Sequence, residues 1–145
     1  MARFEVRPVP LAETRALRQR VLRPHQSVGE LAGDEPTGAV AFGAFDGDEL
    51  VAVGLVGPDG EPGDWRVRGM ATQPHARGRG AGTQILDRLV QYAIAHGAGR
   101  VWCNARTSAL GLYQRAGFVV ASDEFEPPHI GPHYRMELSV TAAPG

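Results

Sequence analysis

Several short apolar runs along this chain have the character of β-strands, and residues 4–7 and 65–72 also show the two-residue period that predicts a strand of a half-buried sheet. Two of the runs are joined by Asp46-Gly47-Asp48, which is a hairpin signal, and the next connection, residues 57–63, is rich in glycine and proline. We therefore expect an antiparallel meander. The predicted strands are residues 4–7, 39–45, 49–56, 65–72, 99–105, 118–125 and 134–140.

Alternation within the run at 65–72 predicts one packed face and one partly solvated face. The residues expected to share the first face are Trp65, Val67 and Gly69, and those expected on the second are Arg66, Arg68 and Met70.

Other stretches carry apolar residues at helical spacing. Pro8 and Pro10 are expected to end the first strand, and a helix is predicted over Leu11–Leu22, stopped by Pro24. The composition of residues 25–37 predicts a loop or one short helix.

Two further helices follow in the second half. One begins near Gly82, with apolar residues at 85, 86, 89, 90, 93 and 94, and the other covers residues 108–116, with Thr107 or Ser108 as its N-cap. Each is expected to end at a glycine, Gly97 and Gly117 respectively.

The order of these elements predicts a single α+β domain over residues 1–145, with a mixed central sheet of about seven strands between helices on both faces, as three layers. The strand, helix and strand order from 65 to 105 implies a right-handed parallel or splayed pair, the fourth and fifth strands. Residues 141–145 are expected to fray.

Composition and charge narrow the function classes. The chain has 145 residues, 43% of them hydrophobic and 21% charged, which is the balance of a soluble globular domain. Its formal net charge of -1 gives no support for binding nucleic acid or an anionic membrane through the whole domain. No signal peptide or membrane-spanning run is found, and the single cysteine, Cys103, fits a reducing compartment, so we expect a cytoplasmic protein.

A glycine-rich turn precedes the helix near Gly82. Gly78, Gly80 and Gly82 allow a tight turn, and a helix start offers free N–H groups and a positive dipole end to an anion. The turn lacks the Gly-Lys-Ser/Thr of a Walker loop and the Gly-x-Gly-x-x-Gly of a dinucleotide fold. With Arg66, Arg68, Arg77 and Arg79 as a local basic patch, it suits a small anionic ligand.

The turn resembles the coenzyme A pyrophosphate loop of the GNAT superfamily of acyl-CoA-dependent N-acyltransferases, whose Arg/Gln-x-x-Gly-x-Gly/Ala motif is matched at Arg77, Gly80 and Gly82. A second stretch, residues 104–118, resembles the other signature of that family: an asparagine, Asn104, then a short helix with a tyrosine, Tyr113, closed by Gly-Phe. The resemblance covers the chain from about residue 64 to the last strand and implies the GNAT fold, splayed between its fourth and fifth strands.

The resemblance also implies a set of cofactor contacts and an acid. Tyr113 would protonate the coenzyme sulfur, a backbone N–H near Met70 would face the developing oxyanion, and Thr72 would lie along the pantetheine arm. The alternative for Tyr113 is a buried aromatic residue without a catalytic role. The alternative for Asn104 is an ordinary turn asparagine. The implied contacts with acetyl-CoA are Met70, Ala71, Thr72, Arg77, Gly78, Arg79, Gly80, Ala81, Gly82, Thr83, Asn104 and Tyr113.

Five residues are candidates for the base that deprotonates the acceptor amine, and the sequence does not rank them firmly: Glu61, Asp64, Glu124, His129 and His133. Residues 127–133 contain three prolines and two histidines, and this stiff segment, which resembles a Pro-His segment of some GNAT-like proteins, predicts a wall at the acceptor end of the cleft. His133 is the preferred catalytic candidate because it adjoins a strand. A rigid connector without such a role is the alternative.

Cys103 is not expected to act as a nucleophile, because a strand cysteine beside a tryptophan is more often a small buried hydrophobe. No His, Cys, Asp and Glu cluster has metal-ligand spacing, so no metal is predicted.

Together these features predict an acetyl-CoA-dependent N-acetyltransferase that acts on a primary amine of a small molecule or a peptide by direct attack in a ternary complex. The alternative is a noncatalytic acyl-CoA-binding or regulatory module. No nucleic acid or membrane partner is expected, and homodimer formation is left open.

Overall fold

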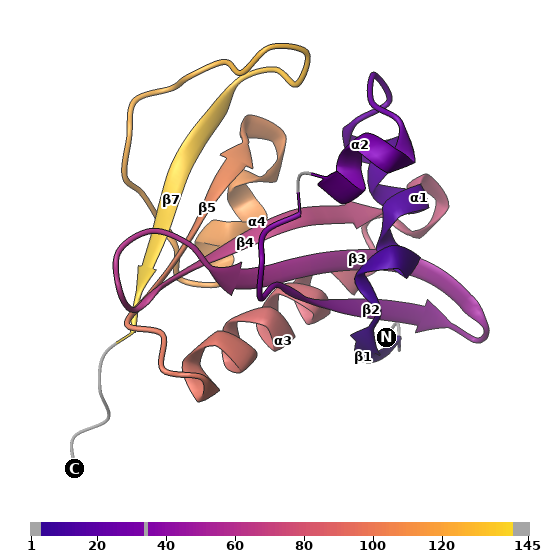
Figure 1. The fold of residues 1–145 in the computed structure, drawn as a ribbon, viewed down its shortest axis with the longest axis horizontal. Helices are drawn as coiled ribbons and strands as arrows, with labels where there is room; N and C mark the ends of the chain where they lie inside the picture. Colours follow the sequence, from indigo (N-terminus) through magenta and orange to yellow (C-terminus); the bar gives the residue numbers. More distant parts are fainter. Residues whose placement is uncertain (1–3, 34, 141–145) are drawn as a thin grey trace.

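Seven strands of the described chain, residues 4–33 and 35–140 of the computed structural model, form one mixed sheet. They are β1 (Glu5–Val9), β2 (Val40–Asp46), β3 (Glu49–Pro58), β4 (Asp64–Thr72), β5 (Arg100–Arg106), β6 (Val119–Val120) and β7 (His133–Ser139). Their order in the sheet is β1-β2-β3-β4-β5-β7-β6, and Figure 1 shows the arrangement. The predicted fold class is confirmed. The tail at 141–145 lies outside the described residues.

Helices cover both faces of this sheet. Their bounds are α1 (Leu11–Leu22), α2 (Val28–Gly33), α3 (Ala81–Ala95) and α4 (Leu110–Arg115), with short 3-10 turns η1 (Pro74–Ala76) and η2 (Thr107–Ala109). On one face Leu17 of α1 packs with Val53 and Ala71. On the other, most of the apolar positions predicted for α3 are buried, with Ile85 and Leu89 at 0% exposure, whereas Ile94 is 46% exposed. Within the region 25–37, the short helix α2 covers Val28–Gly33.

The antiparallel meander from β1 to β4 follows the prediction, including the hairpin at residues 46–49. The expected effect of Pro8 was wrong, because this residue lies inside β1, opposite Phe42 of β2. β1 is the edge of the sheet, and an edge strand tolerates proline when the ring nitrogen faces away from the neighbouring strand. Pro10 instead occupies the N-cap of α1.

A β-bulge in β4 overturns the predicted alternation. The pairs Leu55–Arg68 and Val53–Ala71 leave Gly69 and Met70 together opposite one residue of β3. Gly69 has φ +63, a conformation that glycine adopts without strain. The extra residue moves Met70 to the face of Val67 and α3, and not to the face of Arg68.

The fourth and fifth strands splay apart as expected. β4 and β5 run parallel, but they pair over residues 64–66 and 100–102, close to their first residues. In Figure 1 β4 then runs to the right, while β5 runs upward beside the antiparallel β7, so the two halves of the sheet diverge. This divergence creates the space in which the candidate site lies.

The chain after α4 differs from its prediction. The expected strand at 118–125 is reduced to Val119 and Val120, followed by an isolated bridge between Phe125 and His133. The ladder is interrupted because the Ser122 hydroxyl accepts the backbone N–H of Arg135 at 2.9 Å. The predicted N-cap of α4 was also wrong, since residues 107–109 form η2 and no side chain caps α4.

Candidate active site

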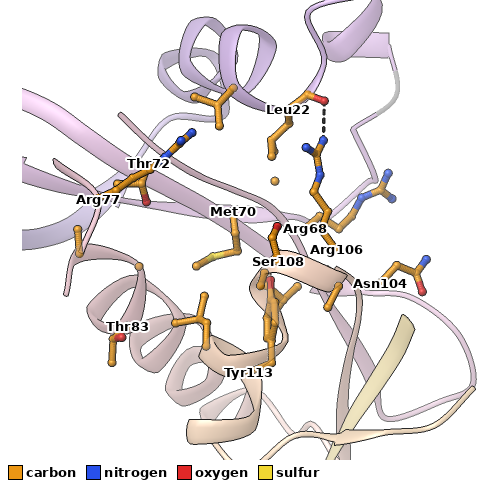
Figure 2. Close-up of a pocket in the computed structure, with 18 of the residues that line it drawn as sticks. Leu22, Arg68, Met70, Thr72, Arg77, Thr83, Asn104, Arg106, Ser108 and Tyr113 are labelled. Atoms are coloured by element: carbon orange, nitrogen blue, oxygen red, sulfur yellow. Dashed lines mark hydrogen bonds between the residues drawn. The ribbon is translucent and has the colours of Figure 1, made fainter. Parts of the chain in front are cut away.

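A cleft of about 780 Å³ opens between the diverging strands. Its walls come from β4, the glycine turn and the start of α3, β5, η2 and α4. Figure 2 shows Arg77, Thr72 and Thr83 toward one end, Arg68, Arg106 and Asn104 toward the other, and Met70 and Tyr113 between them. The two motifs found in the sequence therefore line the same cleft from opposite sides.

The glycine turn leads into the first turn of α3 as predicted. Gly80 has φ +89 and forms the N-cap, so a residue with a side chain would be strained there. The Gln84 N–H donates to the Gly80 carbonyl at 3.1 Å. The N–H groups of Ala81, Gly82 and Thr83 precede it, where a helix has no internal acceptor, and these residues line the cleft. Such a helix terminus is suited to binding an anion.

The two arginines of the turn behave differently. Arg77 lines the cleft, and in the described part of the chain its guanidinium has no hydrogen-bond or ion-pair partner. Arg79 turns away, with its guanidinium 3.3 Å from an Asp46 carboxylate oxygen and above the Phe4 ring. The predicted contact through the Arg79 side chain is therefore not supported. The basic patch predicted from four arginines does not form as one surface.

The β4 bulge shapes the middle of the cleft. Met70 lines it with its side chain, and the interrupted ladder at Gly69 and Met70 leaves backbone groups available to a ligand. Thr72 also lines the cleft. Ala71 points to the opposite face, into the core beside Leu17, so its side chain cannot make the predicted cofactor contact.

Tyr113 is 5% exposed and lines the cleft from α4. Its ring meets Phe118 edge to face, with 5.5 Å between centroids. Burial, together with the neighbouring Cys103 thiol, raises the pKa of Tyr113 far above its usual value, so the hydroxyl stays protonated. Burial also raises the pKa of Cys103 to about 12, which keeps it a thiol. Both groups therefore hold their protons at neutral pH, and Cys103 is not suited to nucleophilic attack.

His133 is the first residue of β7, opposite Arg106 of β5, and its side chain lines the cleft. Its Nδ1 lies 2.7 Å from the Gly131 carbonyl, which can only accept, so Nδ1 carries the hydrogen and Nε2 has a free lone pair. Burial lowers the pKa of His133, the bond to Gly131 opposes this shift, and Arg106 and Arg23 add to it. The imidazole is therefore neutral near pH 7.

The other predicted bases lie elsewhere. Asp64 sits where β4 and β5 still pair, and it forms an ion pair with Arg100 at 2.8 Å that lowers the pKa of the carboxyl. Glu61 is exposed in the preceding loop, and Glu124 is exposed and 3.4 Å from the Tyr134 hydroxyl. His129 packs its ring against His25 at 5.0 Å. Of the five candidates, His133 is the one that lines the cleft.

A second cavity of about 480 Å³ adjoins the cleft and shares Arg68, Asn104 and His133 with it. α1, the segment after α2 and the loop at 127–130 complete its walls, so part of the proline-rich segment lines a cavity. Glu35 also lines this cavity, and no pattern in the sequence pointed to it. Both Glu35 oxygens accept hydrogen bonds from Arg15, at 2.9 and 3.0 Å, and one accepts a further bond from Arg18 at 2.6 Å.

These bonds make Glu35 a poor base. Arg15 lowers the pKa of Glu35 most, and Arg18 adds to the effect against the opposing influence of burial. A carboxylate held in its charged form by two guanidinium groups has little tendency to take a proton. His133 thus remains the side chain best suited to accept a proton in this region.

Residues 9–118 match the sequence model of the Acetyltransferase (GNAT) family. Over 140 residues the chain is 31% identical to the uncharacterized N-acetyltransferase YitI of Bacillus subtilis (strain 168), a match that covers 92% of this chain and 94% of that protein. The chain therefore belongs to the GNAT acetyltransferase family, as its two motifs indicate.

Solved structures share the fold. The ribosomal-protein-S18-alanine N-acetyltransferase from Escherichia coli has a TM-score of 0.79 and 17% identity, covering 98% of this chain and 97% of that one. A Bacillus subtilis acetyltransferase in complex with CoA has a TM-score of 0.74 and 16% identity, covering 96% and 100%. At these identities the likeness concerns the fold alone.

Two further properties concern the described residues only. Within 4–33 and 35–140, no helix combines the length and the apolar character needed to cross a membrane. Over the same ranges, His, Cys, Asp and Glu side chains do not gather in groups of three that could hold a metal ion.

Proposed function

We propose that this chain is an acetyl-CoA-dependent N-acetyltransferase that transfers an acetyl group to a primary amine by direct attack in a ternary complex. One observation carries this proposal: an anion-binding helix terminus and a buried, protonated tyrosine line the same cleft. The CoA complex of a structurally similar Bacillus subtilis acetyltransferase supports the same ligand class.

The glycine turn would hold the coenzyme. The pyrophosphate of the coenzyme would accept hydrogen bonds from the N–H groups at residues 81–83, with the charge of Arg77 beside them. Thr72 lies at the same end of the cleft as Arg77, and Met70 lies farther along it (Figure 2). A backbone N–H of the bulge would stabilise the carbonyl oxygen of the thioester as negative charge develops on it.

Two side chains would carry out the proton transfers. The neutral amine attacks the carbonyl carbon, so that a C–N bond forms and the C–S bond breaks. Tyr113 gives its hydroxyl proton to the departing sulfur, and His133 Nε2 takes a proton from the amine. The products are the N-acetyl amine and the free coenzyme thiol, and return of the proton to Tyr113 restores the enzyme.

The state of Cys103 supports direct attack over an acyl-enzyme. Its side chain is 1% exposed, and a pKa raised to about 12 leaves almost no thiolate at neutral pH. A thiol in this state is a poor nucleophile.

The test is release of coenzyme thiol from acetyl-CoA in the presence of a panel of primary amines and short peptides. Amine-dependent release with formation of the N-acetyl product supports the proposal. CoA binding by calorimetry without any amine-dependent release would instead favour a noncatalytic acyl-CoA-binding module.

A further inference from the structure

The smaller cavity forms the far end of the cleft from the glycine turn. Arg68, Asn104 and His133 line both cavities, so a molecule in the smaller one borders the proposed reaction centre. The rings of His25 and His129 meet at 5.0 Å and bring the segment after α1 against the loop before β7. Because the coenzyme would enter from the opposite end, this cavity is where an acceptor would bind.

The charge lining this cavity is strongly unbalanced. Among the described residues, Glu35 is its single carboxylate, and two arginines already neutralise it. The arginines that line the cavity are Arg18, Arg23, Arg66 and Arg68. The whole chain has a formal net charge of -1, so the excess of positive charge is a local property of this site.

Two of these arginines have unused hydrogen-bonding capacity. Within residues 4–33 and 35–140, the Arg68 guanidinium makes no hydrogen bond or ion pair. Arg66 is placed by an Asp59 carboxylate at 3.5 Å and by stacking over Trp102, and its buried Nε has no partner in the described chain. Burying a guanidinium donor without an acceptor is costly, so such a donor usually has a function or a ligand.

Arg66 and Arg68 also repel each other, because the charge of Arg68 contributes to lowering the pKa of Arg66 after burial. An anion between the two guanidinium groups would relieve this repulsion. The same field opposes a plain ammonium ion, and a polycation such as a polyamine would be rejected most strongly.

We propose that the acceptor is a small amine that also carries an anionic group, a carboxylate or a phosphate, bound by Arg68 with Arg66 beside it. This inference rests on the proposed acetyl transfer. Anchoring the anion at Arg68 leaves the amine end of the molecule free to reach His133, which lines the same cavity from β7. The positive surroundings also favour the neutral amine, the form that attacks the thioester.

The first experiment compares amines that differ only in the anion. Glycine, β-alanine, 4-aminobutanoate and L-leucine are each tested against the corresponding amide, and phosphoethanolamine against ethanolamine, by thiol release at a fixed acetyl-CoA concentration. We expect kcat/KM for at least one anionic member to exceed that of its neutral partner by about 10- to 100-fold, the range of a charge-assisted hydrogen bond. The pair that shows the preference identifies carboxylate or phosphate.

The second experiment removes the proposed anchor. Arg68→Gln should abolish most of this preference through a higher acceptor KM, while the neutral amine and the affinity for CoA change little. Arg68→Lys should restore part of it. Arg20→Gln, which removes the same charge from an exposed position of α1, is the matched control and should leave the preference intact.

Neutral amines that react as well as their anionic partners would overturn the inference, as would an equal loss for both members of a pair in Arg68→Gln. If no amine releases thiol, the proposed transferase activity fails, and the inference is judged by calorimetry on the CoA-loaded protein. Binding of 4-aminobutanoate or phosphoethanolamine, but not of 4-aminobutanamide or ethanolamine, then supports the anion site. Equal binding, or none, overturns it.

Discussion

Gly82→Asp should separate folding from coenzyme binding. Gly82 lies in the first turn of α3 with ordinary helical backbone, whereas Gly80 has φ +89 and would be strained by any side chain. A Cβ on Gly82 would meet only Leu112 Cδ2 at 3.8 Å and Thr72 Oγ1 at 3.9 Å within 4 Å, which are ordinary contacts. The substitution therefore fits the fold while it projects toward the cleft.

The expected effects on stability and on binding have opposite signs. An aspartate in the first turn of a helix interacts favourably with the dipole by about 0.3–1 kcal/mol, so the free energy of unfolding should stay level or rise. Two unit charges about 4 Å apart at an effective dielectric of about 20 repel by about 4 kcal/mol. A carboxylate beside the pyrophosphate should thus weaken CoA binding by about 10²- to 10³-fold.

Calorimetry of CoA binding and a thermal melt without ligand measure the two effects. Gly82→Asn has nearly the same shape without the charge and should lose less affinity, and Gly82→Ala less again. A folded Gly82→Asp variant that binds CoA with the parent Kd would refute the assignment of this helix terminus as the pyrophosphate site.

Tyr113→Phe keeps the ring against Phe118 but removes the proton donor, so kcat should fall by about 10²-fold while CoA affinity holds; a parent kcat would reduce Tyr113 to packing. His133→Asn retains a donor for the Gly131 carbonyl but lacks the basic nitrogen, and it should lower kcat/KM for the acceptor without changing the Kd of CoA. Because burial holds the pKa of His133 below its usual 6.5, kcat/KM should be level above that pH and decline only below it, and a profile unchanged in His133→Asn would contradict this assignment. The free energy of unfolding should also fall as the pH is lowered below about 6.5, because His133 takes up a proton at a higher pH in the unfolded chain than in the folded protein. Cys103→Ser should keep kcat within a few-fold of the parent value, and complete loss of activity would indicate an acyl-enzyme on Cys103.

Local sequence patterns were sufficient to predict the features that depend on interactions between residues close together in the chain. The glycines before α3 permit a turn that few other residues allow, and the apolar spacing after them specifies which side of the helix is buried. Tyr113 could be placed on a helix after β5 by the same reasoning. These features explain why the glycine turn and the start of α3 could be predicted from the order of the amino acids.

The lining of the smaller cavity depended on contacts between distant segments. Arg68 on β4, His133 on β7 and Glu35 after α2 come together only when the sheet diverges, and no periodicity relates them. A single inserted residue at Gly69 reversed the face predicted for Met70, because a bulge shifts the two-residue alternation that follows it. Asp64 was a candidate base until its pairing with Arg100 placed it away from the cavities.

By itself, then, the amino-acid sequence determined the fold class, the helix terminus that offers its N–H groups to an anion, and the position of Tyr113 along the chain. Only the tertiary structure decided that Arg79 pairs with Asp46 while Arg77 faces the cleft, and that His133 is neutral with a free Nε2. The physical reason is that backbone preferences act over a few residues, whereas burial, ion pairing and protonation depend on neighbours that long-range folding brings together.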